Sequence, residues 1–402
     1  MIYQKFTDDL KAMFPETVAL RRTLHRYPEI SFQEKQTRQL IQQELECYGY
    51  TGIETEVGGG GIIARIDTGK PGPVIGLRAD FDALPIEEET GLEFQSQIPG
   101  VMHACGHDAH TAILLSVARI AQKYAGELTG KLVFIFQHAE EVHPGGAVGI
   151  VDSGKLEDLD FIFGLHVIGN DKFTGKIKYC PEYAMAASDR FDIEIQGIGG
   201  HGASPHTSVD SVVTAALLIQ QLQTIVSRKK DPIEKGVLSF SAFTAGEGAH
   251  NIIADKAHLK GSVRTFKPEM QDLFETEISK MSAAAAQANG AQCTVTYCRG
   301  YPSLYNDPAT TDTLKELFES RFGADYVEAV SPSMGGEDFA YYLQKIPGTF
   351  FLIPAGIPEQ VINYPHHHPQ FTVDERSLLL GAEAFAAIID HYLTENPAKA
   401  GE

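Results

Sequence analysis

Four short apolar runs constrain the fold of this chain more than any other feature. Their hydrophobic residues follow one another without the every-second-residue polar alternation of a strand that has one face in water. Such runs are typical of strands buried on both faces, as in an α/β sheet covered by helices. They lie at 73–79, 131–137, 160–166 and 349–353. Helices are predicted at 109–124, between two of the runs, and before Pro28, where Leu20, Leu24 and Tyr27 share one face.

The middle of the chain has a different pattern. Phe191, Ile193 and Ile195 alternate with polar residues in 190–196, which predicts a strand with one buried face. Similar alternation recurs at 238–242, 257–263 and 295–297. Helices are predicted at 268–288 and between the first two strands, the latter packing through one stripe of Val212, Ala215, Ala216, Ile219, Leu222 and Val226. The order β-α-β-β-α-β is the split βαβ, ferredoxin-like pattern.

These two patterns predict two domains, which a chain of 402 residues is long enough to form. We expect residues 1–187 and 300–402 to build an α/β sheet domain together. An α+β domain at 188–299 is then inserted into it.

Charge and cysteine content narrow the function classes. Lys and Arg total 33 against 53 Asp and Glu, a net charge of −20, which disfavours nucleic acid and anionic membranes as partners. No apolar run reaches the roughly 18–20 residues of a membrane-spanning helix, and charges within the first 20 residues argue against a signal peptide. Five cysteines at wide spacing imply no disulfide framework. We therefore expect a cytoplasmic protein.

The densest group of polar side chains is the loop 103–110, just before the predicted helix. It holds Cys105 and His107, and a thiolate and an imidazole two residues apart can bind one metal ion from a loop. Asp108 could cap the helix or orient the imidazole. A purely structural role for this segment remains the alternative.

Carboxylates and imidazoles also follow the predicted strands. Glu140 and Glu141 come after 131–137, and His166 ends 160–166. The ligand crevice of an open α/β sheet lies at these strand ends, where one carboxylate can bind a cation and the other can take a proton from water. A surface turn and a structural histidine are the alternatives. Two further groups are Asp80 and Asp82 after 73–79, and three successive histidines at 366–368. Together these groups suffice for a site of two metals.

Taken in order, these segments resemble the M20 metallopeptidase/aminoacylase family, in particular its amidohydrolase branch. The resemblance spans nearly the whole chain. The matching stretches are RRTLHRYPEISFQE (21–34), LRADFDALPIEE (77–88), MHACGHDAHTA (102–112), EE with PGGA (140–147), GLHV (164–167), GGHGASPH (199–206), NIIAD (251–255), GSVRTF (261–266), GGEDFAYY (335–342) and HHHPQFTVDE (366–375).

The resemblance implies a metallo-exopeptidase-like (phosphorylase/hydrolase-like) sheet domain that binds two divalent ions, Zn, Mn, Co or Ni. Glu140 is then the general base and Asp82 an orienting carboxylate. His367 is preferred over its neighbours because the family pattern is His-x-Pro-x-Phe. The implied metal ligands are Cys105, His107, Glu141, His166 and His367. The resemblance gives no clear role to Asp80, Glu337 or Asp338.

For the inserted domain, the resemblance implies a lid and dimerisation role, in a homodimer or a dimer of dimers. His201 would stabilise the oxyanion in the partner subunit's site. Asn251 and Arg264 would bind substrate, since a guanidinium can donate hydrogen bonds to both oxygens of an α-carboxylate. A surface histidine and an exposed strand-end charge are the alternatives for His201 and Arg264.

The predicted function is hydrolysis of the amide bond of N-acyl-amino acids by a metal-activated water. Three rivals remain at this point. A peptidase (dipeptidase, aminopeptidase or small endopeptidase) would act on short peptides through the same site. A thiol enzyme would use Cys105 as nucleophile. A non-catalytic protein would keep the fold and bind metal without turnover.

Overall fold

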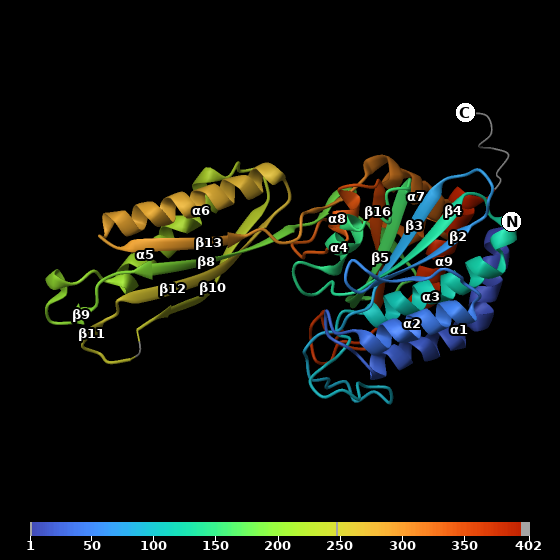
Figure 1. Ribbon diagram of the computed structural model, residues 1–402, viewed down its shortest axis with the longest axis horizontal. Coiled ribbons are helices and arrows are strands. Elements are labelled where there is room, and N and C mark those ends of the chain that lie inside the picture. The colour runs from blue at the N-terminus through green and yellow to red at the C-terminus, as the bar shows by residue number, and fades with distance from the viewer. Residues whose placement is uncertain (1, 247, 395–402) are drawn as a thin grey trace. The chain divides into compact units, whose positions relative to one another are not determined.

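The computed structural model describes residues 2–246 and 248–394, which form two compact units (Figure 1). The first unit comprises Met1–Ala184, Tyr305–Ser331 and Asp338–Glu402. The second comprises Met185–Leu304 and Pro332–Glu337, the latter a short segment outside 188–299.

The first unit is built on one large mixed sheet. Its strands are β1 (Glu54–Val57), β2 (Gly61–Asp67), β3 (Val74–Asp80), β4 (Lys131–Gln137), β5 (Phe161–Lys172), β6 (Ile177–Tyr179), β15 (Val327–Ala329) and β16 (Gly348–Gly356). They lie in the order β1-β2-β4-β3-β5-β16-β6-β15. The four apolar runs form the central strands β4, β3, β5 and β16, which are parallel. The α/β sheet predicted from the runs is therefore confirmed.

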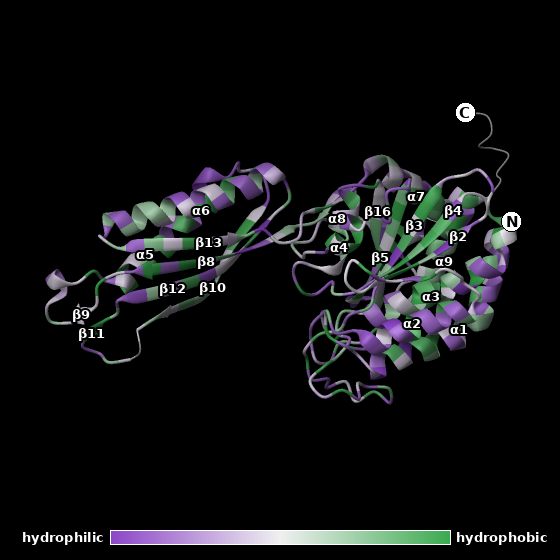
Figure 2. Ribbon diagram, in the orientation of Figure 1, coloured by the Kyte–Doolittle hydropathy of each residue, from purple (hydrophilic) through white to green (hydrophobic). Residues whose placement is uncertain are grey.

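Helices cover this sheet. They are α1 (Ile2–Arg26), α2 (Lys35–Cys47), α3 (His107–Lys123), α4 (Gly146–Asp152), α7 (Pro308–Phe322), α8 (Ala340–Leu343) and α9 (Arg376–Leu393). Helix α3 packs on β3, β4 and β5, α9 packs on β16 and β4, and α1 packs on both helices. The central strands are strongly hydrophobic, whereas α1 and α2 alternate apolar and polar residues (Figure 2). The main core lies between the sheet and these helices.

The second unit has its own antiparallel sheet, in the order β10-β12-β8-β13. Its elements follow along the chain as β8 (Ala187–Gln196), α5 (Ser211–Thr224), β10 (Gly236–Ala245), β12 (Lys256–Thr265), α6 (Pro268–Ala288) and β13 (Gln292–Cys298). Two short strands of this unit, β9 (Gly200–His201) and β11 (Ile252–Ile253), pair with each other. Most residues of β7 (Glu182–Met185) and β14 (Leu304–Asn306), which also pair, belong to the first unit. Both helices contribute to a separate core.

The predicted packing stripe of α5 is wrong in part. Val212 is 39% exposed and Ala216 is exposed as well, whereas Leu218 and Ile225 are buried. Apolar residues cover most of the circumference of α5, so hydrophobic periodicity alone could not select the buried face.

No helix among the described residues is both long and apolar enough to cross a bilayer.

Candidate metal centre and active site

The parallel strands of the first unit bring the predicted site residues to one edge of the sheet. Asp80 ends β3 and Asp82 follows it, while Glu140 and Glu141 follow β4. His166 lies within β5, and His366 and His367 follow β16. Because these strands run in the same direction, their carboxyl ends meet at one edge.

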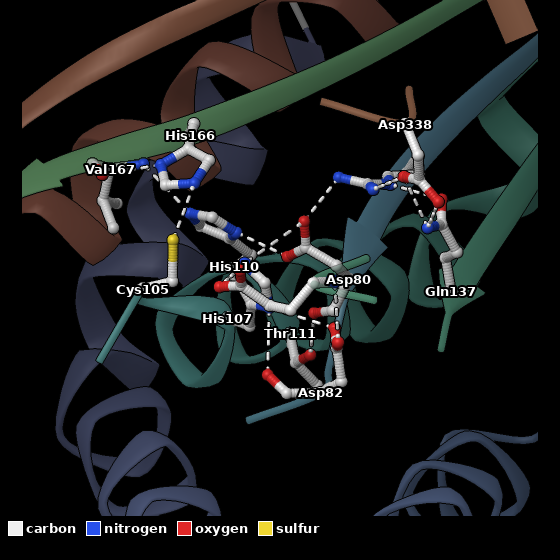
Figure 3. A network of polar contacts seen from close by, with 12 residues as sticks. Asp80, Asp82, Cys105, His107, His110, Thr111, Gln137, His166, Val167 and Asp338 are labelled. Atoms are coloured by element: carbon white, nitrogen blue, oxygen red, sulfur yellow. Dashed lines mark hydrogen bonds and ion pairs between the residues drawn. The ribbon is translucent and has the colours of Figure 1, made fainter. Parts of the chain in front are cut away.

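Cys105 lies at the centre of this cluster and is buried. Its Sγ is 3.5 Å from His166 Nε2 (Figure 3) and 3.3 Å from His366 Nδ1. Cys105, Glu141 and His367 also place one ligand atom each within 4.8 Å of one another. Burial, with the charges of Glu141 and Glu140, raises the pKa of the Cys105 thiol well above its usual value.

The carboxylate of Glu141 lies close to two histidines, His367 and His107. Glu141 Oε2 is 3.3 Å from His367 Nε2, and Glu141 Oε1 is 3.9 Å from His107 Nε2. His107 Nε2 and Glu141 Oε1 are buried, and neither forms a hydrogen bond to any described residue. Polar atoms buried in this way ordinarily cost about 1–3 kcal/mol each. A cation bound between them would remove that cost.

Hydrogen bonds fix the tautomers of two histidines. His107 Nδ1 lies 2.9 Å from the Asp82 carbonyl oxygen, and His166 Nδ1 lies 2.7 Å from the Val167 carbonyl oxygen. A carbonyl oxygen only accepts, so each Nδ1 carries the proton and donates it. In its neutral form each ring therefore presents the Nε2 lone pair to the cluster, the arrangement expected of a metal-binding histidine.

His110 is close to these rings, but both of its nitrogens form hydrogen bonds to other groups. Its Nε2 accepts a hydrogen bond from the Val167 backbone N–H at 2.9 Å, and its Nδ1 donates to Asp80 Oδ1 at 2.6 Å (Figure 3). Both ring nitrogens are thus used. His110 links the end of β3 to β5 beside His166 and is a poor candidate for a ligand.

The two aspartates at the end of β3 contact different groups. Asp82 is buried, and its carboxylate lies 3.2 Å from His107 Nδ1 and accepts from the Glu141 backbone N–H at 3.0 Å. Asp80 accepts from Arg78 at 2.5 Å and from His110. Burial alone would raise the pKa of Asp80, but the Arg78 guanidinium, His107 and His110 outweigh it and hold the pKa well below its usual range.

Asp338, which had no assigned role, belongs to a buried network in the same unit. It accepts hydrogen bonds from the Gln137 side chain (Figure 3), from Arg78 and from the Ala147 backbone N–H. Glu337 is also buried.

Asp108 does not cap α3, whose N-cap is Gly106 without a side-chain bond. Its carboxylate instead pairs with Arg21 at 2.7 Å and His25 at 2.8 Å, because both lie on α1 against the start of α3. The carboxylate in contact with His107 is that of Asp82.

The remaining predicted residues belong to the second unit. His201 and Asn251 are exposed and close together, since β9 pairs with β11 and the Gly202 N–H donates to the Asn251 carbonyl oxygen. Arg264 is separate from them on β12 and half-buried, and burial lowers its pKa although Asp189 opposes the shift.

Three residues near the cluster were missed by sequence reasoning. His366 contacts Cys105, His110 contacts Asp80, and Glu34 accepts from the backbone of Ala139. The run of three histidines flagged the first, but only its neighbour matched the family pattern. Glu34 lies in the matching stretch 21–34, but no pattern in the chain points to its contact with Ala139.

Comparison with known proteins decides the family. Residues 76–391 match peptidase family M20/M25/M40. The chain belongs to this family. It is 44% identical to YhaA of Bacillus subtilis (strain 168), a protein named as an amidohydrolase, over 98% of this chain and 99% of that protein.

It is 38% identical to N-acetylcysteine deacetylase of the same organism, over 94% of this chain and 97% of the relative. The crystal structure of B. subtilis YXEP, described as a dinuclear metal binding peptidase from the M20 family, superposes with a TM-score of 0.80 at 35% identity. That match covers 94% of this chain and 98% of YXEP. The chain is therefore a hydrolase of the amidohydrolase or peptidase type.

Proposed function

We propose that this protein hydrolyses the amide bond of N-acyl-amino acids with two divalent metal ions bound at the cluster around Cys105. The observation that carries the proposal is the set of ligand atoms gathered beside the buried Glu140, all on buried or half-buried residues except the exposed His367, in a member of a hydrolase family. The name of the deacetylase relative supports an N-acyl-amino acid as substrate.

The donor set fits such ions. Cys105, His107, Glu141, His166 and His367 combine a thiol, imidazoles and a carboxylate, which suits Zn and also admits Mn, Co or Ni. The unbonded His107 Nε2 and Glu141 Oε1 further support a cation there. Bound metal would polarise the scissile carbonyl and lower the pKa of a water molecule.

The chain's own residues would then handle the proton. Glu140 is buried beside His107 and Glu141, and its carboxylate would accept a proton from the attacking water and return it to the departing amine. Asp82 would hold the His107 ring and the Glu141 backbone in fixed positions.

Several parts of the proposal come from the family resemblance. His201 would donate to the oxyanion in a partner subunit, and Asn251 and Arg264 would bind substrate. The inserted domain, predicted at 188–299, would serve as lid and dimerisation domain. The protein would act as a homodimer or a dimer of dimers in the cytoplasm. Peptide hydrolysis is the second candidate, favoured by the description of YXEP as a peptidase.

Replacement of the proposed base tests the mechanism. We expect Glu140→Gln to lower kcat on N-acetyl- and N-benzoyl-amino acids by about 10²–10⁴-fold, with the metal content per chain unchanged. Glu157→Gln, at an exposed position, is the matched control. Retained activity would remove Glu140 from the role of base. A dipeptide panel assayed in parallel separates the two substrate classes.

A further inference from the structure

The segment 29–34, between α1 and α2, contacts both loops that carry the proposed catalytic carboxylates. Ile30 forms a parallel bridge with Ala83, and the Ala83 N–H donates to the Glu29 carbonyl oxygen at 2.8 Å. Ser31 Oγ donates to Asp82 Oδ2 at 2.7 Å. Glu34 Oε1 accepts from the Ala139 N–H at 2.9 Å. One short segment therefore joins the loop after β3 to the loop after β4.

Ala139 is the residue that most needs such a contact. Its φ is +51°, in the left-handed region that a residue with a Cβ seldom adopts. Strain of this kind persists only where the surroundings impose it. The next two residues are Glu140 and Glu141, so the backbone at Ala139 sets the direction of both carboxylates.

Two carboxylates hold the backbone of this turn. Glu34 accepts the N–H of Ala139, and Asp82 accepts the N–H of Glu141 at 3.0 Å. Asp82 is itself held by Ser31 of the same segment. The N–H groups on either side of Glu140 are thus fixed from the segment 29–34.

Glu34 occupies an unfavourable place for a carboxyl group. It is 1% exposed, and burial, together with the nearby charge of Asp82, raises its pKa to about 7. Buried carboxyl groups with a shifted pKa cluster at functional sites. Both the acid and the carboxylate have an oxygen that accepts the Ala139 N–H.

We propose that Glu34 is a positioning residue that fixes the backbone of the Ala139–Glu141 turn and thereby orients the carboxylate of Glu140. This inference rests on the proposed function, in which Glu140 is the base.

The test compares three substitutions. Glu34→Leu removes the acceptor, whereas Glu34→Gln keeps an uncharged acceptor at the same distance. Glu34→Asp keeps a carboxyl group, but its side chain is one methylene shorter, which moves the acceptor oxygen away from the Ala139 N–H. Gln33→Leu, at the exposed neighbouring position, is the control. Circular dichroism and thermal unfolding of the metal-free proteins establish that each variant is folded.

We expect kcat of Glu34→Leu at saturating metal to fall about 10–100-fold, as is typical when a group that orients a metal ligand is lost. KM should stay within about 3-fold, because the acceptor touches no substrate, and Glu34→Gln should stay within about 3-fold of wild type in both constants. Glu34→Asp should lie below Glu34→Gln. A fully active Glu34→Leu, or a Glu34→Gln as impaired as Glu34→Leu, would overturn the proposal.

A second readout does not depend on activity. Glu141 belongs to the same turn, so Glu34→Leu should weaken Zn²⁺ binding about 10–100-fold in competition with a chelating dye, and Glu34→Gln should not. Should the wild type hydrolyse no amide, the proposed function fails, but this titration still tests Glu34. Equal Zn²⁺ affinity in wild type and Glu34→Leu would count against the positioning role.

Discussion

Removal of the Asp338 side chain should destabilise the first unit strongly. Asp338 is buried and accepts from three donors: Arg78 Nη2 at 2.9 Å, Gln137 Nε2 at 2.7 Å and the Ala147 N–H at 3.0 Å. In Asp338→Ala, Arg78 keeps its contact with Asp80, but the guanidinium loses the buried carboxylate of Asp338.

The structure also gives the size of the effect. Breaking a buried ion pair from one side costs about 3–5 kcal/mol, and a donor left without an acceptor in the interior costs about 1–3 kcal/mol. These terms overlap, so we expect Asp338→Ala to lower the free energy of unfolding by about 3–5 kcal/mol. Asp338→Asn should also be costly, because both carboxylate oxygens accept and an amide would turn its NH₂ group toward a donor.

Urea unfolding followed by far-ultraviolet circular dichroism measures this change, since the chain has no tryptophan for fluorescence. Two units can unfold separately, so two transitions are fitted where the curve requires them. Asp312→Ala, at an exposed position of α7, is the control and should change stability by less than about 0.5 kcal/mol. A loss below about 1 kcal/mol for Asp338→Ala would refute the assignment of Asp338 to a buried charge network.

Two further predictions concern the backbone and the pH. Gly106 has φ +91°, and an added Cβ would lie 2.4 Å from Val167 Cγ2, so Gly106→Ala should cost about 2–4 kcal/mol by thermal unfolding. Gly91 has φ +68°, and an added Cβ there would have nothing within 4 Å, so Gly91→Ala should lose only the stability that the unfavourable backbone conformation costs. An equal loss of stability in Gly91→Ala and Gly106→Ala would contradict the steric argument. The pKa of Glu34 rises from 4.5 to about 7 on folding. The contribution of Glu34 to the stability of the folded protein is therefore most favourable below pH 4.5 and is lost as the pH rises through 7. The stability advantage of metal-free Glu34→Gln over wild type should therefore grow between pH 5 and pH 8, by up to about 3 kcal/mol, and a constant difference would refute the assigned burial.

Much of the sheet could be predicted because its signal is local. Each apolar run maps onto a strand, and the helix predicted at 109–124 is α3 at His107–Lys123. The extension of β5 to Lys172 could not be predicted from local hydrophobicity, because the last residues of this strand are polar. Pairing with β16 determines where β5 ends. The buried face of α5 also depends on the sheet beneath it.

The candidate site could be predicted only as a set of residue types. The stretch around Cys105 and His107 identified the thiol and imidazole, and the family pattern added Glu141 and His367. The contacts of His110 with Asp80, and of Glu34 with Ala139, join residues 30 and 105 positions apart in the chain. Which nitrogen of a histidine is free, and which carboxylate supports which turn, follow from the tertiary structure alone.

The central claim is that the cluster around Cys105 holds metal and uses it to hydrolyse N-acyl-amino acids. The most direct measurement is elemental analysis of the purified protein, coupled to the hydrolysis of N-acetyl- and N-benzoyl-amino acids before and after chelation. We predict about two metal ions per chain, activity that disappears with chelator, and recovery on addition of Zn, Mn or Co. Full activity in metal-free protein, abolished by a thiol alkylator, would contradict the account and point to Cys105 as a nucleophile.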